Sequence, residues 1–146
     1  MRAVIQRVTA ASVEVEGVLV GEIGPGLLVY LGVSHADGPE QVAWMARKLA
    51  GLRLLREERS LSDLVAASEP SEALVVSQFT LYGDARKGRR PTWQAAAPGP
   101  VSEPLYDAVC DDLAGLGVRV ARGVFGADMA VASVNDGPVT LILDSP

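Results

Sequence analysis

The sequence predicts a single α+β domain spanning residues 1–146, in which two helices pack against a barrel-like sheet of mixed or antiparallel strands. Three observations support this fold class. Strand-like segments cluster at both ends of the chain, two segments have helical periodicity, and 49% of the residues are hydrophobic, which is enough for a core. We expect about seven or eight strands and no internal domain boundary.

The strands of the first half are marked by alternation and by apolar runs. Val13 and Val15 alternate with Glu14 and Glu16, a period of two that buries one face of a strand. The wholly apolar segment 27–33 predicts a central strand.

The first helix is expected to begin after Asp37, a candidate N-cap, with Glu40 completing a capping box. Gly51 is a natural end for this helix. The buried stripe follows the i, i+3, i+4, i+7 spacing of Val42, Met45, Ala46 and Leu49.

The second half is predicted to alternate between strands, loops and one helix. That helix is expected over residues 102–117, capped by Ser102 and with Pro104 in its first turn. Residues 56–71 are polar and predict a loop with one helical turn. The remaining strand-like segments are 52–55, 72–83, 118–125, 128–134 and 139–144.

The overall composition limits the classes of protein that fit. A net charge of −5 argues against a protein that coats nucleic acid non-specifically, and no DNA partner is expected. The single cysteine, Cys110, excludes an intrachain disulfide framework and fits a reducing compartment. No signal peptide or membrane-spanning run is indicated, so we expect a cytoplasmic protein without a membrane partner.

The usual catalytic groups are scarce. His35 is the only histidine, and Cys110 falls on the apolar side of a predicted helix, where a buried thiol is expected. One Cys and one His without clustered ligands give no metal site.

Two short stretches carry polar groups beside apolar strands. In the first, "VVSQFTL", strand periodicity places Ser77 and Phe79 on one face and Gln78 and Thr80 on the other. The second, "NDGPVT" (135–140), puts a proline between two strand-like runs, which requires a turn, a strand start, an edge or a bulge.

These two stretches carry a resemblance to a known family. The chain closely resembles the D-aminoacyl-tRNA deacylases, with Ser77-Gln78-Phe79-Thr80 and Asn135-x-Gly-Pro-Val-Thr140 as the two defining motifs. The similarity runs from "MRAVIQRVTAASVEV" to "VNDGPVTLILDS" and covers nearly the whole chain. It implies a homodimer with active sites at the subunit interface. It also implies hydrolysis of the ester that joins a D-amino acid to tRNA, with glycyl-tRNA as a secondary substrate and no metal or organic cofactor.

The resemblance implies a chiral filter made of main chain. In the family the Gly137–Pro138 bond is cis, and the loop enters the partner's site to accept hydrogen bonds from the substrate's α-ammonium group. A D side chain then points into open space, whereas an L side chain meets the main chain. We expect Asn135 and Thr140 to brace this loop, next to Val139.

The other predicted roles are as follows. The N–H groups around Phe79 and Thr80 are candidate oxyanion donors, within a catalytic set that also contains Ser77 and Gln78. Thr80 is either a nucleophile or a positioning group, and the absence of a base favours the second role. Three further residues are expected in substrate binding: Arg7 as an anchor of the inserted loop, and Phe125 and Met129 in the adenosine pocket. Contacts to tRNA phosphates are assigned to Arg86, Lys87, Arg89 and Arg90.

Two alternative functions stay open at this stage. A non-catalytic RNA-binding module would use the basic loop, but no aromatic residues are interleaved with its charges. A hydrolase of another small ester, built on Thr80 or Ser34, would act without tRNA.

Overall fold

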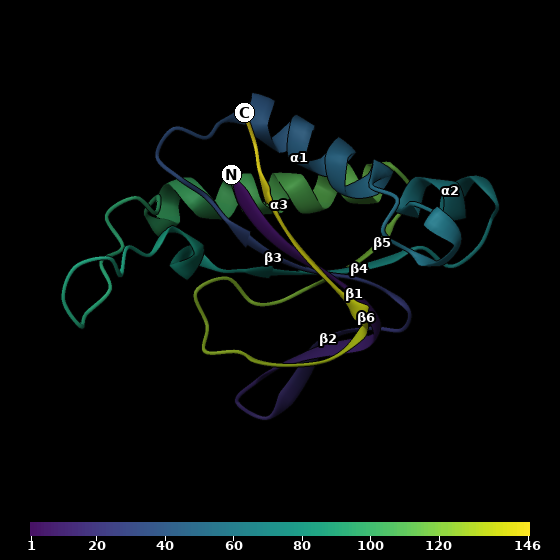
Figure 1. Ribbon diagram of the computed structural model, residues 1–146, viewed down its shortest axis with the longest axis horizontal. Coiled ribbons are helices and arrows are strands. Elements are labelled where there is room, and N and C mark those ends of the chain that lie inside the picture. The colour runs from purple at the N-terminus through teal and green to yellow at the C-terminus, as the bar shows by residue number, and fades with distance from the viewer.

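The computed structural model describes residues 1–146. Six strands form one mixed sheet that curls into a nearly closed barrel (Figure 1). The sheet order is β2-β1-β3-β4-β5. Strand β6 pairs with β1 along the edge opposite to the one that β3 occupies. Only the β3–β4 and β4–β5 pairs are parallel. The strands are β1 (Arg2–Val15), β2 (Val18–Ile23), β3 (Gly26–Gly32), β4 (Glu72–Ser77), β5 (Arg119–Arg122) and β6 (Ala130–Asp144). The predicted α+β class with a barrel-like mixed sheet is therefore confirmed.

The barrel nearly closes where β2 approaches β5. A Cβ atom at Gly21 would lie 2.7 Å from the carbonyl oxygen of Arg122, so only glycine allows this approach. The Arg119 guanidinium also donates a hydrogen bond of 3.2 Å to the carbonyl oxygen of Glu22. These contacts connect β2 with β5, the first and last strands in the order β2-β1-β3-β4-β5.

Two long helices, α1 (Pro39–Gly51) and α3 (Gly99–Gly115), lie side by side over one face of the sheet (Figure 1). They are the two packed helices that the sequence predicts. A third, α2 (Leu61–Ala66), is a short helix in the segment expected to hold one helical turn. Two 3₁₀ turns, η1 (Arg56–Glu58) and η2 (Phe79–Tyr82), complete the structure.

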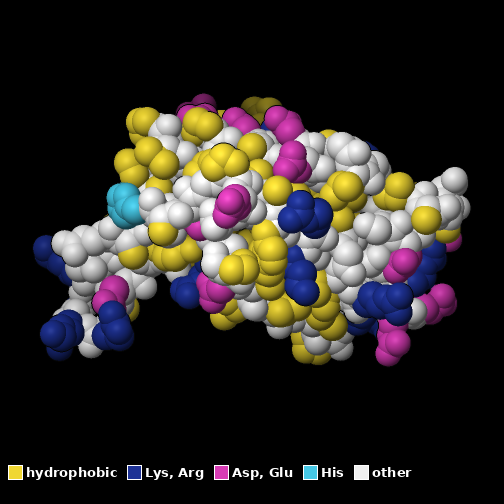
Figure 2. Space-filling model, turned by 90° about the horizontal axis from the view of Figure 1, so that it is seen from above, with side chains coloured by type: hydrophobic (Ala, Val, Ile, Leu, Met, Phe, Trp, Pro, Cys, Tyr) yellow, Lys and Arg dark blue, Asp and Glu magenta, His cyan; other side chains and the backbone are white.

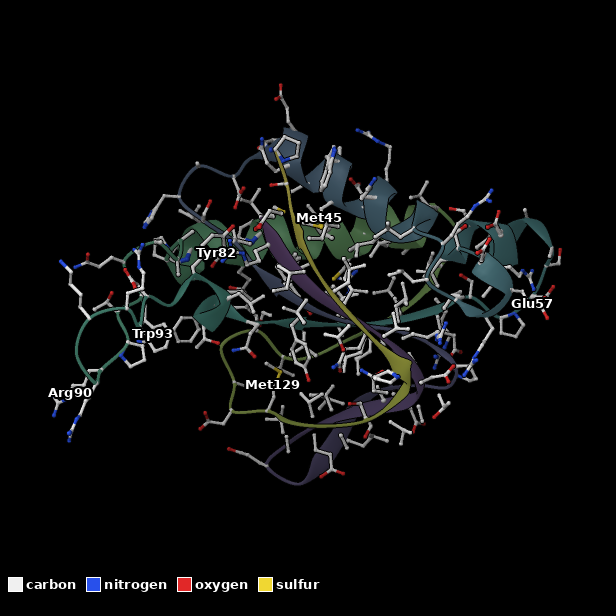
Figure 3. The ribbon with its side chains drawn as sticks, in the orientation of Figure 1. Met45, Glu57, Tyr82, Arg90, Trp93 and Met129 are labelled. Atoms are coloured by element: carbon white, nitrogen blue, oxygen red, sulfur yellow. The ribbon has the colours of Figure 1, made fainter.

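The core has two parts because the strands are buried on both faces. Leu27 and Val29 of β3 face the helices, where Met45 lies between α1 and the strands (Figure 3). Leu28 of β3 and Leu74 of β4 fill the barrel instead. This two-sided burial explains why segment 27–33 is wholly apolar.

The predicted start of α1 is wrong by one residue, and the predicted capping box is wrong. Gly38 is the N-cap, and the Gln41 side chain accepts a hydrogen bond of 3.0 Å from its N–H. The Asp37 carboxylate is instead bound to the N–H and hydroxyl of Ser34 and to the terminal ammonium group. Its oxygens are therefore not free to cap the helix.

The predicted start of α3 is also wrong. The helix begins at Gly99 with Pro98 as the N-cap, and the Ser102 hydroxyl donates to the carbonyl oxygen of Pro98 at 3.1 Å. Pro104 consequently lies inside the helix, not in its first turn.

The strand count is lower than predicted. Residues 52–55 form no strand, and β4 ends at Ser77, two residues before η2 begins at Phe79. Residues 130–134 of the predicted segment 128–134 and all of 139–144 belong to the single strand β6, which continues through the Gly-Pro pair. No helix in the structure combines the length and the apolar character needed to cross a bilayer.

Candidate functional site

A cavity of about 300 Å³ opens beside the end of β4. Its walls come from the end of β3, the end of β4 with η2, the first half of α3 with the residues just before it, and the loop that leads into β6 with the start of that strand. The lining residues are Leu31, Val33, Val76, Ser77, Gln78, Phe79, Ala97, Ser102, Tyr106, Phe125, Gly126, Ala127, Asp128, Met129 and Val131.

The four predicted catalytic residues meet at the mouth of this cavity. Ser77 ends β4, and the Gln78 N–H makes a hydrogen bond of 2.8 Å to the carbonyl oxygen of Leu31 before the chain turns into η2. Phe79 and Thr80 open this turn, so their N–H groups have no acceptor within it. The predicted alternation of faces over 77–81 is therefore wrong, because the strand ends before Phe79.

The Thr80 hydroxyl has a single side-chain partner. Its oxygen accepts a hydrogen bond from the amide nitrogen of Gln78, and Thr80 is exposed next to the cavity without lining it. An amide N–H cannot remove the hydroxyl proton, so no general base activates Thr80 in this arrangement.

The inner wall of the cavity is aromatic and apolar, and both residues predicted for the adenosine pocket belong to it. Phe125 lies against Tyr106 with 5.9 Å between ring centroids. The Tyr106 hydroxyl donates to the carbonyl oxygen of Val75 at 2.9 Å, and burial raises the pKa of this phenol. Met129 packs so closely on Gly123 that a Cβ atom there would lie 2.6 Å from its sulfur.

The cavity has little ionisable chemistry. Asp128 is the only carboxylate in its lining, and His35 lies outside it with its Nε2 atom 3.1 Å from the carbonyl oxygen of Gln94. Cys110 is buried, which raises the pKa of its thiol to about 11 and keeps it protonated at neutral pH. No three His, Cys, Asp or Glu side chains lie close enough to share a metal ion.

The second motif forms a bulge in β6. Val8 of β1 pairs with Asn135, whereas Gln6 pairs with Thr140, so residues 136–139 bulge out of the ladder. The Gly137–Pro138 peptide bond within this bulge is cis. Proline is tolerated here because the bulge lies on a strand that pairs along one edge only.

Side chains within the motif hold the bulge in shape. The Asn135 amide oxygen accepts from the Val139 N–H at 2.9 Å, and the amide nitrogen donates to the Thr140 hydroxyl at 2.9 Å. Gln6 donates to the same hydroxyl at 3.1 Å. The expected bracing by Asn135 and Thr140 is thus present in the structure.

Arg7 anchors the bulge of its own chain. Its Nε atom donates to the carbonyl oxygen of Asp136 at 2.9 Å, and its Nη1 atom donates to the carbonyl oxygen of Leu54 at 3.1 Å. The carboxylate of Asp136 also binds the Arg56 guanidinium, which lowers the pKa of that carboxyl group. Arg7 was predicted to anchor the loop across the subunit interface, whereas its observed hydrogen bond to Asp136 lies within one chain.

The cavity and the bulge lie at opposite ends of β3. Arg7 pairs with Leu27 near the start of β3, while Ser77 pairs with Leu31 near its end. Four residues of strand separate these positions by about 13 Å. None of residues 135–140 lines the cavity.

The four predicted phosphate-binding residues lie on a projecting hairpin loop. Figure 2 shows this cluster of Lys and Arg side chains set apart from the body of the molecule. Arg86 is bound to the Asp84 carboxylate, whose pKa it lowers. No carboxylate lies within 4.0 Å of Lys87, Arg89 or Arg90.

Sequence reasoning missed several residues around the cavity. Tyr106 and Ser102 were recognised only as helix residues, and Trp93 was assigned no role. The position of Trp93 could have indicated its role, because it lies three residues after Arg90. It supplies an aromatic group next to the basic loop, in which no interleaved aromatic residue is predicted.

Comparisons with known proteins give a consistent result. Residues 4–144 match a family model described as "D-Tyr-tRNA(Tyr) deacylase". A relative from Kineococcus radiotolerans, named D-aminoacyl-tRNA deacylase, is 62% identical, with 99% of this chain and 100% of the relative covered. A relative of the same name from Thermobifida fusca is 61% identical, with 99% of each covered.

Two solved structures share the fold. One, called "c-Myc DNA Unwinding Element Binding Protein", is 39% identical with a TM-score of 0.89, covering 100% of this chain and 99% of that one. The other, "Structural Analysis of a probable eukaryotic D-amino acid tRNA deacylase", has a TM-score of 0.84 at 20% identity. It covers 99% of this chain and 98% of its own and supports the fold alone.

Proposed function

Because the chain belongs to the D-Tyr-tRNA(Tyr) deacylase family and is a hydrolase of D-aminoacyl-tRNA, we propose that it acts as a homodimer with two shared active sites. Each site combines the cavity of one protomer with the Gly137–Pro138 bulge of the other. The protein works in the cytoplasm, where tRNA is charged, and needs no metal or organic cofactor.

The observation that carries this proposal is the separation of the two motifs within one chain. The cavity beside Ser77 and the bulge at Gly137 lie at opposite ends of β3, so one protomer cannot bring them together. The strand that bears the bulge has a free edge and exposes Val134 and Ile142 to 59% and 64%. A second copy is the natural cover for such an edge.

The hydrolytic step uses positioning more than ionisable groups. An aminoacyl ester is already activated, and the neighbouring ribose hydroxyl can help to deliver the attacking water. The N–H groups of Phe79 and Thr80 then stabilise the negative charge that develops on the carbonyl oxygen. Ser77 and Gln78 shape this end of the site, and Gln78 fixes the Thr80 hydroxyl as a positioning group.

The chirality of the substrate is sensed by main chain. The carbonyl oxygens of Gly137 and Pro138 accept hydrogen bonds from the α-ammonium group, while Val139 and its neighbours hold the bulge in shape. The side chain of a D-amino acid then points away from the main chain, and that of an L-amino acid collides with it. Glycine has no side chain to exclude, so glycyl-tRNA is also hydrolysed.

The rest of the substrate extends along the other predicted residues. The terminal adenosine packs against Phe125 and Met129 in the cavity. The unpaired charges of Lys87, Arg89 and Arg90 bind phosphates of the acceptor end, with the partly neutralised Arg86 behind them.

Hydrolysis of charged tRNA tests the reaction. The purified protein is incubated with D-tyrosyl-tRNA, L-tyrosyl-tRNA, glycyl-tRNA and a tRNA-free tyrosyl ester, with duplex DNA as a competitor. We expect loss of the D and glycyl esters, an intact L ester and no inhibition by DNA. Equal hydrolysis of D- and L-tyrosyl-tRNA, or rapid cleavage of the tRNA-free ester, would contradict the proposal.

Mixing two defective variants tests the shared site. Gln78→Ala alters the cavity and Gly137→Ala alters the bulge, so each homodimer has two damaged sites. A mixed dimer has one site in which both parts are intact, and random mixing restores roughly a quarter of wild-type activity. No recovery after exchange of subunits, confirmed by mass, would place both parts of a site in the same chain.

A further inference from the structure

An exposed tryptophan stands at the base of the basic hairpin loop. Asp84 and Thr92 close this loop with a pair of backbone hydrogen bonds of 2.9 Å each, and Trp93 follows directly. Its side chain is 41% exposed. Figure 3 shows Trp93 between the body of the protein and Arg90, which lies near the tip of the loop.

The indole ring is held in a fixed place and does not simply extend into solvent. A Cβ atom at Gly83 would lie 2.4 Å from Cζ3 and 3.0 Å from Cε3 of Trp93, so the ring rests on bare backbone. Phe79 packs against it edge to face, with 5.4 Å between centroids and 75° between planes.

Phe79 links this ring to the cavity. It lines the cavity and is itself 56% exposed, so the aromatic surface runs without a break from the cavity mouth to Trp93. Beyond Trp93 lie the unpaired cations of the loop, Lys87, Arg89 and Arg90. An aromatic face next to unpaired cations is the combination that binds single-stranded nucleic acid by stacking and charge.

We propose that Trp93 is a stacking platform for the base of the nucleotide that precedes the terminal adenosine of the tRNA substrate, an inference that rests on the proposed function. With the aminoacyl-adenosine in the cavity, the single-stranded 3′ end leaves past Phe79. The next base meets the indole face, and the phosphates that follow meet the basic loop. The resulting subsite binds any base, because stacking uses the ring face common to all of them.

Fluorescence tests the subsite without any turnover. The chain has two tryptophans, so in a Trp44→Phe background Trp93 is the single reporter. The probes are an uncharged RNA minihelix with an intact 3′ end and the same minihelix with an abasic penultimate nucleotide. We expect the intact probe to quench Trp93 and the abasic probe to bind about tenfold more weakly, equivalent to about 1.4 kcal/mol. Equal quenching and affinity for the two probes would overturn the proposal.

Kinetics with D-tyrosyl-tRNA provide the matched variants. Trp93→Leu removes the aromatic face and should raise KM about tenfold with little change in kcat, whereas Trp93→Phe keeps a ring and should stay within about threefold of wild type. Gly83→Ala displaces the indole without removing it and should raise KM like Trp93→Leu. Its Cβ atom would also lie 3.0 Å from the carbonyl oxygen of Thr80, so a fall in kcat is expected in this variant as well. An abasic substrate should abolish the difference between Trp93→Leu and wild type.

Two results would refute the subsite while leaving the proposed function standing. One is an unchanged KM for Trp93→Leu when wild type hydrolyses D-tyrosyl-tRNA normally. The other is a rise in KM with the abasic substrate that is equally large in wild type and in Trp93→Leu, together with a weaker dimer in the variant. The second result would assign Trp93 to contact with a second copy of the chain. Failure of wild type to hydrolyse D-tyrosyl-tRNA would count against the proposed function, and the fluorescence titration would still decide the stacking.

Discussion

Substituting Gly137 by alanine tests whether the bulge must keep its observed shape. Gly137 has a φ of +149°, which L side chains rarely adopt. A Cβ atom there would lie 2.8 Å from the Val139 nitrogen, 2.9 Å from Val139 Cγ2 and 3.1 Å from an Nη atom of Arg7. Two of these three neighbours belong to Val139, which is tied to Asn135 and cannot retreat freely.

The size of the effect can be worked out against a matched glycine. Gly17 also has a positive φ, +76°, but a Cβ atom there would meet nothing within 4 Å. Gly17→Ala therefore measures the backbone penalty alone, about 1 kcal/mol. Gly137→Ala adds steric overlap with a braced bulge, and we expect a total loss of about 3 kcal/mol in the free energy of unfolding.

Urea unfolding and deacylation of D-tyrosyl-tRNA provide the two measurements. Gly17→Ala should keep the wild-type rate, whereas Gly137→Ala should lose about a hundredfold in kcat/KM, because its carbonyl groups move by a fraction of an ångström or more. The reasoning fails if the two variants unfold at the same urea concentration and Gly137→Ala keeps both its rate and its preference for the D ester.

Three further predictions concern single groups of the structure. Thr80→Ala should keep at least roughly a tenth of the wild-type single-turnover rate, because the Thr80 hydroxyl acts as a positioning group and not as the nucleophile. Complete loss of the rate with unchanged tRNA binding would favour a nucleophilic role. Replacing Arg89 and Arg90 by alanine should raise KM and reduce the slope of log KM against log salt concentration by about 1.5 to 2. An unchanged slope would show that these two arginines do not contact tRNA phosphates. The Cys110 thiol has a pKa raised by burial from 9.0 to about 11, so it ionises earlier in the unfolded chain. The free energy of unfolding should then fall by about 2 kcal/mol as pH rises from 9 to 11. Cys110→Ala should remove this part of the pH dependence, and identical pH profiles of the two proteins would contradict it.

The packed core was predictable because it follows simple periods. The helical stripe predicted at Val42, Met45 and Leu49 is buried in α1, and Val13 is buried beside an exposed Glu14 in β1. Burial of an apolar face controls these positions, and the sequence displays that face directly.

The end of β4 was not predictable because it depends on a different strand. Residues 72–83 are strand-like in sequence throughout, but β3 ends at Gly32 and offers no partner beyond Leu31. A Cβ atom at Gly32 would lie 3.0 Å from the carbonyl oxygen of Gln78 and 3.2 Å from the Cβ of Leu81. Gly32 therefore leaves the space in which η2 crosses the end of β3.

The bulge in β6 was predicted as a class of feature but not as part of a continuous strand. Proline between two apolar runs indicates a turn, an edge or a bulge equally well. The choice is made by Asn135, whose side chain takes over the hydrogen bond of the Val139 N–H and lets pairing with β1 resume at Thr140. A side chain that replaces a ladder bond leaves no periodic signal in the sequence.

The same departure from strand geometry creates the mouth of the site. Had β4 continued, Phe79 would share a sheet face with Ser77, and Thr80 would be one residue further along an extended chain. The turn at η2 instead directs Phe79 outward onto Trp93 and leaves the N–H groups of Phe79 and Thr80 free of ladder partners. Free donors and an exposed aromatic pair are unfavourable in an ordinary strand end, and both are useful where an ester carbonyl and a stacked nucleotide must bind. The segment in which the pattern of the sequence misleads is therefore the segment to which the chemistry is assigned.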